Sequence, residues 1–450
     1  MINLLFVFGT YSLIFNMIRP FAGISLPDAF FFASFILVII EGIMKRRSIK
    51  VWLPYHPLWF PAFLFLIGGL LSSINAVRGL TSISIAIKQF YTFSLWVSLC
   101  IVMVKRGNTR KIITTLIIGA LTTAVVALLD YIFNFGIGNF LVITFYPEQN
   151  FDFYYRTGGT FGHPNELAMF LAIVFPLTAS RYLECSISIG KTKFLRTLYF
   201  LTLIIEFLAI LASGSLTGLL GVFISSCILL FVFLAKHPLV SKPKILLINI
   251  STTICFAMVF WLIIVPFINE RGFLDNLIKQ NSIYRVSQIT GPDRMKLLQE
   301  GLDYIQDHPI LGAGMDQGGT GGLAVSDLVT SYYIHNTIIQ SWVAGGIFVF
   351  IGSLLLYILV VIFAVSGIKK YISTKVTSEF IVGLSSSIFG WVIMDMLQAN
   401  IYQRYKWLVV GLIVGNLLFQ KKATSSKKIL SDRLSRHYLS ANTYPFDSND

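Results

Sequence analysis

Three segments of the chain carry side chains suited to chemistry on a phosphorylated substrate. Arg156 precedes one apolar run, Arg294 opens a polar stretch, and His335 precedes another apolar run. Arginine stays charged and binds phosphate through a bidentate fork, whereas histidine is the side chain best placed to accept a proton near neutral pH. Arginines combined with a histidine therefore suit a phosphorylated donor and a hydroxyl acceptor.

The same residues also have ordinary structural interpretations. A histidine at a helix entrance, such as His335, is more often a cap or an interfacial residue. Arginines on the outer side of a membrane commonly extend their side chains toward lipid headgroups, which would account for Arg156 and Arg294. His163 and His308 stand beside prolines in turn-like contexts, which favours a structural role. Residue types alone leave both interpretations open.

Common catalytic signatures are missing from the sequence. It has no phosphate-binding G-x-x-x-x-G-K-S/T loop, no H-E-x-x-H and no nucleophile elbow of the form G-x-S-x-G. Their absence argues against ATP-driven transport by this chain alone. The four cysteines have no C-x-x-C spacing, which predicts neither a disulfide framework nor a zinc site.

The composition is typical of a protein that crosses a membrane many times. Of the 450 residues, 55% are apolar and 12% are charged, and the mean hydropathy is +0.75. Soluble globular proteins carry about 25% charged residues, so this chain lacks the charge to cover a water-facing surface. We expect an all-α integral membrane protein with about 12 transmembrane helices. The expected spans are residues 2–18, 26–43, 57–76, 82–104, 112–133, 166–183, 197–213, 216–235, 245–267, 336–366, 377–397 and 405–420.

The positive charge follows the pattern of a membrane topology. A net charge of +14 could by itself indicate a nucleic-acid partner. Most of the 35 lysines and arginines, however, fall in alternate connections, as the positive-inside rule describes for cytoplasmic loops. This distribution predicts that both termini are cytoplasmic (N-in/C-in) and that nucleic acid is not a partner. We expect residues 2–18 to be a retained helix rather than a signal peptide.

Two outer connections are long, and they cover about residues 134–165 and 268–335. The second is a large outer (periplasmic) loop, in which helical spacing of apolar residues predicts an amphipathic helix between Pro292 and Asp307. The stripe consists of Met295, Leu298, Leu302 and Ile305. We expect a polytopic membrane domain over residues 1–420 and a disordered basic cytoplasmic tail over 421–450.

Three motifs in this part of the chain follow a recognisable order. Residues 156–168 carry Arg-x-x-Gly-Thr-Phe-x-x-Pro-Asn at the start of a helix, and residues 294–314 form an Arg-led helix that ends in Pro-x-x-Gly-x-Gly. Residues 335–346 begin with His-Asn, and a glycine follows after nine further residues. Over about residues 150–350 the chain thus resembles the O-antigen ligase and O-antigen polymerase superfamily of polytopic membrane glycan transferases.

The resemblance implies a transferase that uses neither a metal nor another cofactor and takes its glycan from an undecaprenyl-diphosphate-linked donor. It makes His335 the candidate general base, and Arg156 and Arg294 the candidate diphosphate ligands. Further candidates for binding the substrate are Asn165, Asn336 and Arg285. The acceptor would be a glycan, a lipid A-core or a protein. The resemblance places the enzyme in the bacterial inner membrane, among membrane lipids, with its active site on the periplasmic face.

Two positions depart from the family pattern. Many members carry Ser-Arg where the seventh and eighth spans meet, whereas this chain has Ser215 followed by Leu216. The second glycine of the family's Gly-x-x-Gly falls on Val349, which predicts altered helix packing below the histidine. The arginines that could replace the missing one are Arg285, Arg404 and Arg19.

Three functions therefore remain open from the sequence. A glycan ligase and a repeat-unit polymerase would bind the same donor, and His335 favours ligase chemistry slightly. A small-solute or ion transporter is the non-enzyme alternative, because Glu206 and Asp395 lie deep in expected spans, where transporters place acidic residues.

Overall fold

The protein is helical throughout the part of the chain that the structure describes. The structure, a computed structural model, describes residues 1–15, 25–46, 54–133, 135–137, 156–187, 193–236, 292–316, 334, 336–373, 379–398 and 403–419. Every regular element in these ranges is a helix, and none of these residues forms a strand. The all-α class is therefore confirmed for the described residues.

The first half of the chain forms a series of apolar helices. They are α1 (Ile2–Ser12), the short η1 (Leu13–Phe15), α2 (Leu26–Met44), α4 (Trp59–Ser72), α5 (Gly79–Phe90), the π-helix η2 (Tyr91–Trp96), α6 (Val97–Lys105) and α7 (Thr109–Phe133). The start of α2 is specified locally, because Ser25 and Asp28 form a capping box.

The second half adds the helices that carry the three motifs. They are η3 (Gly159–Phe161), α9 (Pro164–Ile187), α10 (Lys193–Ser213), α11 (Leu216–Lys236), α16 (Pro292–Asp307), α17 (Thr337–Ser373), α18 (Phe380–Leu397) and a last helix over residues 404–419. The predicted amphipathic helix is confirmed as α16, which spans Pro292–Asp307. Ile305 of its stripe is buried against Ile334 and Val343, whereas Leu302 is exposed.

Eight helical segments of the described residues are long and apolar enough to cross a membrane. They are α2, the continuous segment Gly79–Lys105, α7, α9, α10, α11, α17 and α18. Two shorter apolar helices, Ile2–Phe15 and Trp59–Ser72, also fall at expected spans. The expected span at 245–267 lies outside the described residues. A multi-pass protein is thus confirmed, whereas the count of 12 and the N-in/C-in orientation remain predictions.

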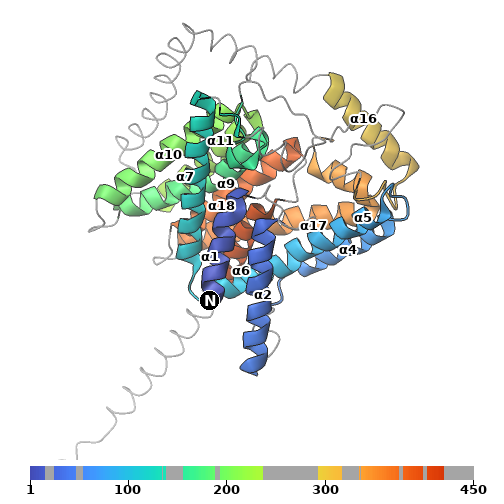
Figure 1. Ribbon diagram of the computed structural model, residues 1–450, viewed down its shortest axis with the longest axis horizontal. Coiled ribbons are helices and arrows are strands. Elements are labelled where there is room, and N and C mark those ends of the chain that lie inside the picture. The colour runs from blue at the N-terminus through green and yellow to red at the C-terminus, as the bar shows by residue number, and fades with distance from the viewer. Residues whose placement is uncertain are drawn as a thin grey trace, which may run out of the picture.

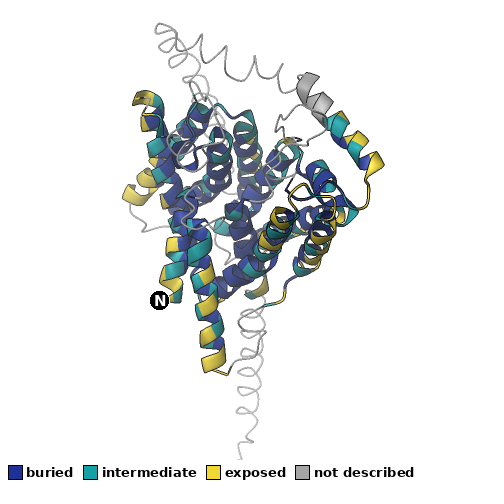
Figure 2. Cartoon of the chain, turned by 45° about the vertical axis from the view of Figure 1, so that its right-hand side comes forward, coloured by how far each residue is buried: buried dark blue, intermediate teal, exposed yellow. Residues whose placement is uncertain are grey.

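The interior of the bundle is formed by helices from both halves of the chain (Figure 1). α9, α11 and α18 pack against one another, and α17 packs against α18 and α4. The largest enclosed side chains include Trp96, Trp391 and Trp407. Buried residues fill the middle of the molecule in Figure 2, and exposed residues include large apolar side chains such as Phe32 and Phe223. Such an outer surface suits contact with lipid.

Candidate active site

The first motif forms a compact loop between the end of α7 and the start of α9. The Thr157 hydroxyl donates a hydrogen bond to Asp130 Oδ2 (2.9 Å), and the Thr160 and Thr123 hydroxyls lie 2.7 Å apart. Gly159 has a φ of +50°, and a Cβ there would lie 3.1 Å from Ala127 Cβ. The loop therefore packs closely onto α7, and its glycine is required by the backbone conformation.

Arg156 connects this loop to two other helix ends. Its Nε donates to the Ser213 carbonyl at the end of α10 (2.7 Å), and its Nη2 donates to Asn165 Oδ1 in the first turn of α9 (2.7 Å). A cation at a helix C-terminus is also stabilised by the helix dipole. Two of the predicted substrate-binding residues, Arg156 and Asn165, are thus in direct contact.

This contact bears on the arginine missing from the α10–α11 junction. Ser213 stands two residues before Ser215 and three before Leu216, the positions where many family members carry Ser-Arg. The guanidinium next to this junction comes from Arg156, which approaches it from the loop before α9. Of the three arginines expected as replacements, Arg285 and Arg19 lie outside the described residues, and Arg404 is bound to Asp28.

Asn336 of the third motif begins α17. Its Oδ1 accepts hydrogen bonds from the backbone N–H groups of Ile338 (3.0 Å) and Ile339 (3.1 Å), which makes it an N-cap. Its Nδ2 donates to the Met396 carbonyl near the end of α18 (3.3 Å). The asparagine therefore fixes the direction in which the chain enters α17, directly after His335.

A chain of hydrogen bonds runs from the first motif to the third. The Ser215 N–H donates to Ser213 Oγ (3.3 Å), and the Ser215 and Thr217 hydroxyls lie 3.0 Å apart. Thr217 then donates to Gln398 Oε1 (3.3 Å), and the Thr337 hydroxyl donates to the Gln398 carbonyl (3.2 Å). The ends of α10, α11, α17 and α18 therefore meet at the same end of the bundle as Arg156.

The last helix contributes polar residues to the same end. Gln403 Nε2 donates to Glu166 Oε1 (2.8 Å) in the first turn of α9. Arg404 holds Asp28 in a bidentate pair, with 2.7 Å from Nε and 2.8 Å from Nη2. Sequence reasoning considered Arg404 only as a replacement and did not single out Gln403 or Asp28. The sequence signal that could have identified them is their position, because Gln403 and Asp28 each stand at the start of an apolar run.

The second motif is attached to α17 through the backbone. The N–H groups of Ala313 and Gly314 donate to the carbonyls of Val343 (2.8 Å) and Ala344 (2.9 Å), and Ile347 donates to the Ile310 carbonyl (3.2 Å). α17 breaks here at Gly346, which has a φ of +66° and a ψ of −164°. Its Cβ would lie 2.0 Å from the Ile310 oxygen, so only glycine fits.

The remaining predicted residues can be placed only in part. Arg294 lies in the first turn of α16, and its side chain is outside the described part of the structure. His335 and Arg285 also lie outside the described residues. The two neighbours of His335 are described, with Ile334 buried and its N–H bound to Gln340 Oε1 (3.1 Å). His308 stacks on Tyr304 with 4.6 Å between the ring centroids, in agreement with its expected structural role.

The fold and this polar end together define a multi-pass helical membrane protein in which polar residues gather where several helix ends meet. Comparison with protein families assigns residues 201–354 to the family described as O-antigen ligase. This match confirms the resemblance to the O-antigen ligase superfamily and covers the second and third motifs, whereas the first motif precedes it. The similarity points to a ligase-type glycan transferase of polysaccharide biosynthesis, with a lipid-linked glycan donor and a glycan acceptor. No curated protein matches the chain.

Proposed function

We propose that the protein is an O-antigen ligase-like membrane glycan transferase. It moves a glycan from an undecaprenyl-diphosphate carrier to an acceptor hydroxyl at the periplasmic face of the inner membrane. The observation that carries this proposal is the hydrogen-bonded chain from Arg156 to the start of α17, next to His335. It brings Arg156, a side chain suited to binding phosphate, to the same end of the bundle as Asn336, the residue that follows the proposed base.

The proposed reaction is a single displacement. His335 accepts the proton of the acceptor hydroxyl as its oxygen attacks the anomeric carbon of the donor sugar. The bond from that carbon to the diphosphate oxygen breaks, and undecaprenyl diphosphate leaves with the bonding electrons. Arg156 and Arg294 stabilise the charge on the departing diphosphate, so positioning and electrostatics supply the catalysis. The product has the inverted anomeric configuration, and retention with a defined donor would contradict this mechanism.

The first test is the carrier-linked glycan of a deletion strain, complemented with wild type or with His335→Ala. Long chains left on the carrier support a ligase, because polymerisation has continued without the protein. Single repeat units support the alternative, a repeat-unit polymerase of the same superfamily. If His335→Ala restores the wild-type profile, His335 is not the base. Asn336→Ala, at the neighbouring position, removes the α17 cap and a candidate substrate-binding amide while it keeps the histidine.

A transporter of a small solute or ion is the second candidate, and Glu206 is the observation that favours it. Glu206 is fully buried on α10 and accepts a hydrogen bond from Thr178 (2.9 Å), while its Oε2 has no partner among the described residues. Asp395 is a weaker argument for transport because Lys406, Tyr357 and Trp391 all bind its carboxylate. Transport predicts loss of function in Glu206→Gln with His335→Ala tolerated, whereas glycan transfer predicts the reverse.

A further inference from the structure

The last turns of α2 border an open cavity of about 490 Å³. Its walls include apolar side chains of α1 and α2, such as Ile2 and Ile40, and its charged residues are Glu41, Lys45 and Arg106. A cavity of this volume is within the range of sites for small molecules. None of these residues takes part in the candidate active site, so the cavity requires an explanation of its own.

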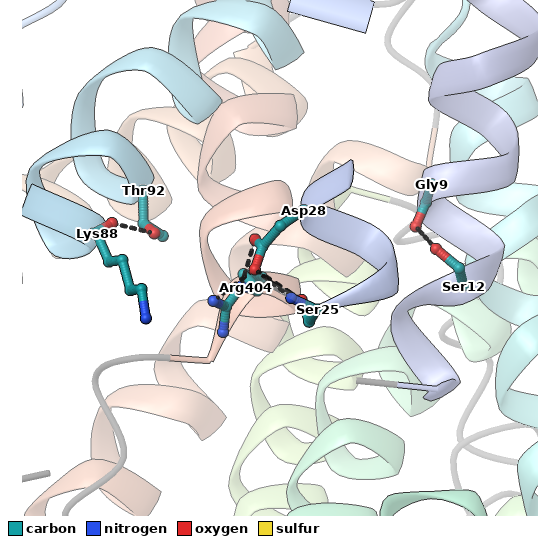
Figure 3. A network of polar contacts seen from close by, with 7 residues as sticks. All are labelled: Gly9, Ser12, Ser25, Asp28, Lys88, Thr92 and Arg404. Carbon is teal, nitrogen blue, oxygen red and sulfur yellow. Dashed lines mark hydrogen bonds and ion pairs between the residues drawn. The ribbon is translucent and has the colours of Figure 1, made fainter. Parts of the chain in front are cut away.

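α2 separates this cavity from the candidate active site. The start of the helix lies at the polar end of the bundle, where Ser25 and Arg404 both bind Asp28 (Figure 3). The helix has 19 residues and is therefore about 28 Å long, close to the hydrocarbon thickness of a bilayer, about 30 Å. The cavity thus lies at the opposite membrane surface, which the distribution of positive charge predicts to be cytoplasmic.

The last turns of α2 project from the bundle. Figure 1 shows that α2 extends past the start of α1, the helix against which it packs. The end of α2 is exposed in Figure 2. An ion pair between Arg106 Nη2, directly after α6, and Glu41 Oε2 (2.6 Å) joins this end of α2 to the bundle. The cavity lies beside the projecting turns, between them and the start of α1.

The charged residues of the cavity carry an excess of positive charge. Glu41 binds Lys45 through Oε1 (2.6 Å) and Arg106 through Oε2 (2.6 Å), so two cations face one carboxylate and the net charge is +1. The Lys45 ammonium keeps N–H donors beyond the one that it uses, and Arg106 Nε and Nη1 make no hydrogen bond with any described residue. The two side chains are 54% and 27% exposed, so these donors can reach a ligand. An anion with several acceptor oxygens suits them.

An apolar track leads from the cavity toward the middle of the membrane. Ile40 lines the cavity, and Ile36 and Phe32 precede it at intervals of four residues. Residues four apart lie on the same face of a helix, and all three of these side chains are exposed. A soluble phosphate would leave this track uncovered, whereas an acyl chain of a phospholipid would cover it.

We propose that this cavity binds the headgroup of an anionic phospholipid from the leaflet at this surface. Lys45 and Arg106 donate charge-assisted hydrogen bonds to the oxygens of the phosphodiester, and an acyl chain lies along Ile40, Ile36 and Phe32. The bound lipid supports the projecting end of α2. A lipid with a charge of −1 neutralises the excess charge, so phosphatidylglycerol should bind more tightly than zwitterionic phosphatidylcholine. This site is independent of the proposed function, because it lies at the other membrane surface.

The test measures the first lipid bound by the full chain in a neutral detergent, by native mass spectrometry. Phosphatidylglycerol and phosphatidylcholine are titrated separately. We expect Lys45→Gln to weaken binding of phosphatidylglycerol about fivefold, the effect of one basic residue at an anionic surface. Glu41→Gln should strengthen it by a similar factor, because it removes the carboxylate that competes with the phosphate. Lys111→Gln removes an exposed cation at the start of α7, outside the cavity, and is the matched control, expected to bind as wild type.

The sign of the Glu41→Gln effect distinguishes a lipid site from a structural ion pair. Weaker binding by this variant would show that Glu41 only holds α2 in place, and would overturn the proposal. Equal losses in Lys45→Gln and Lys111→Gln would indicate a general attraction to a basic surface, and equal affinity of wild type for the two lipids would exclude selection by charge. Displacement of phosphatidylglycerol by inorganic phosphate would assign the cavity to a soluble anion. Each of these results overturns the lipid site.

A second measurement applies if Lys45→Gln does not fold. Phosphatidylglycerol with a photoreactive acyl chain is added to the wild-type protein, and the labelled peptides are identified. Labelling of α1 or α2 supports the site, and labelling confined to other helices overturns it.

Discussion

At the scale of single residues, the geometry of Arg156 explains why an arginine stands there. Its guanidinium donates in two directions, to the Ser213 carbonyl and to Asn165 Oδ1. A lysine ammonium on a flexible stem cannot reproduce this fork. Arg156 therefore holds the loop before α9 against the end of α10 and at the same time presents a fixed positive charge for the proposed diphosphate.

We expect Arg156→Lys to reduce glycan transfer by about tenfold or more although the charge is kept, because it loses the fork. The measurement is the transfer rate in membranes that contain equal amounts of protein. Arg110→Lys is the control, since Arg110 is 62% exposed and lies at the other end of α7. Wild-type transfer by Arg156→Lys would show that a positive charge alone suffices.

The sequence predicted the types of these residues better than their contacts. Arg156 was found because it stands in a polar segment that leads into an apolar run, and Asn165 and Asn336 were found through the family resemblance. The contact of Arg156 with Ser213 spans 57 positions, and that of Gln403 with Glu166 spans 237. Such contacts depend on which helix ends meet in space, and hydropathy contains no such information.

At the scale of elements, hydropathy located the helices well because an apolar run of this length forms a helix in a membrane. The same signal missed how they are interrupted. α17 has a break at Gly346, and the helix from Gly79 to Lys105 contains a π-helical turn. Both irregularities depend on packing partners, so a pattern of apolar residues could not reveal them.

Three elements are joined by a buried ion pair. Lys406 of the last helix and Asp395 of α18 are both fully buried, and Tyr357 of α17 donates to the same carboxylate (2.7 Å). We expect Lys406→Met to lower the free energy of unfolding by about 3–5 kcal/mol, because it leaves a buried carboxylate unpaired. Asp395→Asn combined with Lys406→Met should recover most of this loss. Denaturant unfolding in detergent measures both, and a double variant as unstable as the single one contradicts the account.

His56 predicts a dependence of stability on pH. Burial lowers its pKa from 6.5 to about 4, because the imidazolium form is poorly solvated in the interior, and the hydrogen bond to the Ser94 carbonyl offsets only part of this shift. Between these two values the unfolded chain binds more protons than the folded one, so the free energy of unfolding falls as the pH decreases from 6.5 to 4. The loss reaches about 3 kcal/mol.

The measurement is the melting temperature of detergent-solubilised protein between pH 7 and pH 4. His56→Gln keeps an amide donor for the Ser94 carbonyl and does not titrate, so we expect a smaller decrease in its melting temperature than in that of the wild type. Equal decreases in both proteins would show that His56 is not responsible.

At the scale of the whole molecule, the described contacts agree with one arrangement of the helix ends. The starts of α2, α9, α11, α17 and helix 404–419 meet the ends of α10 and α18 through the hydrogen bonds described above. The positive-inside distribution of charge predicts that these joined ends lie on the outer side. Helix 404–419 then runs inward, and we expect residue 450 to lie on the cytoplasmic side. A fluorescent-protein fusion there should fluoresce, and an alkaline phosphatase fusion should be inactive. The same reporters joined after residue 133 should give the opposite result, and phosphatase activity at residue 450 would invert the topology.

The break in α17 also limits how this protein can be recombined with similar proteins. Backbone groups of Ile310, Ala313 and Gly314 bind groups on both sides of Gly346, so a separate part of the chain completes this helix. A chimaera that exchanges residues 337–373 alone would keep the glycine but combine it with a foreign loop. The smallest exchangeable module therefore extends from the loop at 309–316 through α17, and specificity swaps within this superfamily should be cut outside these limits.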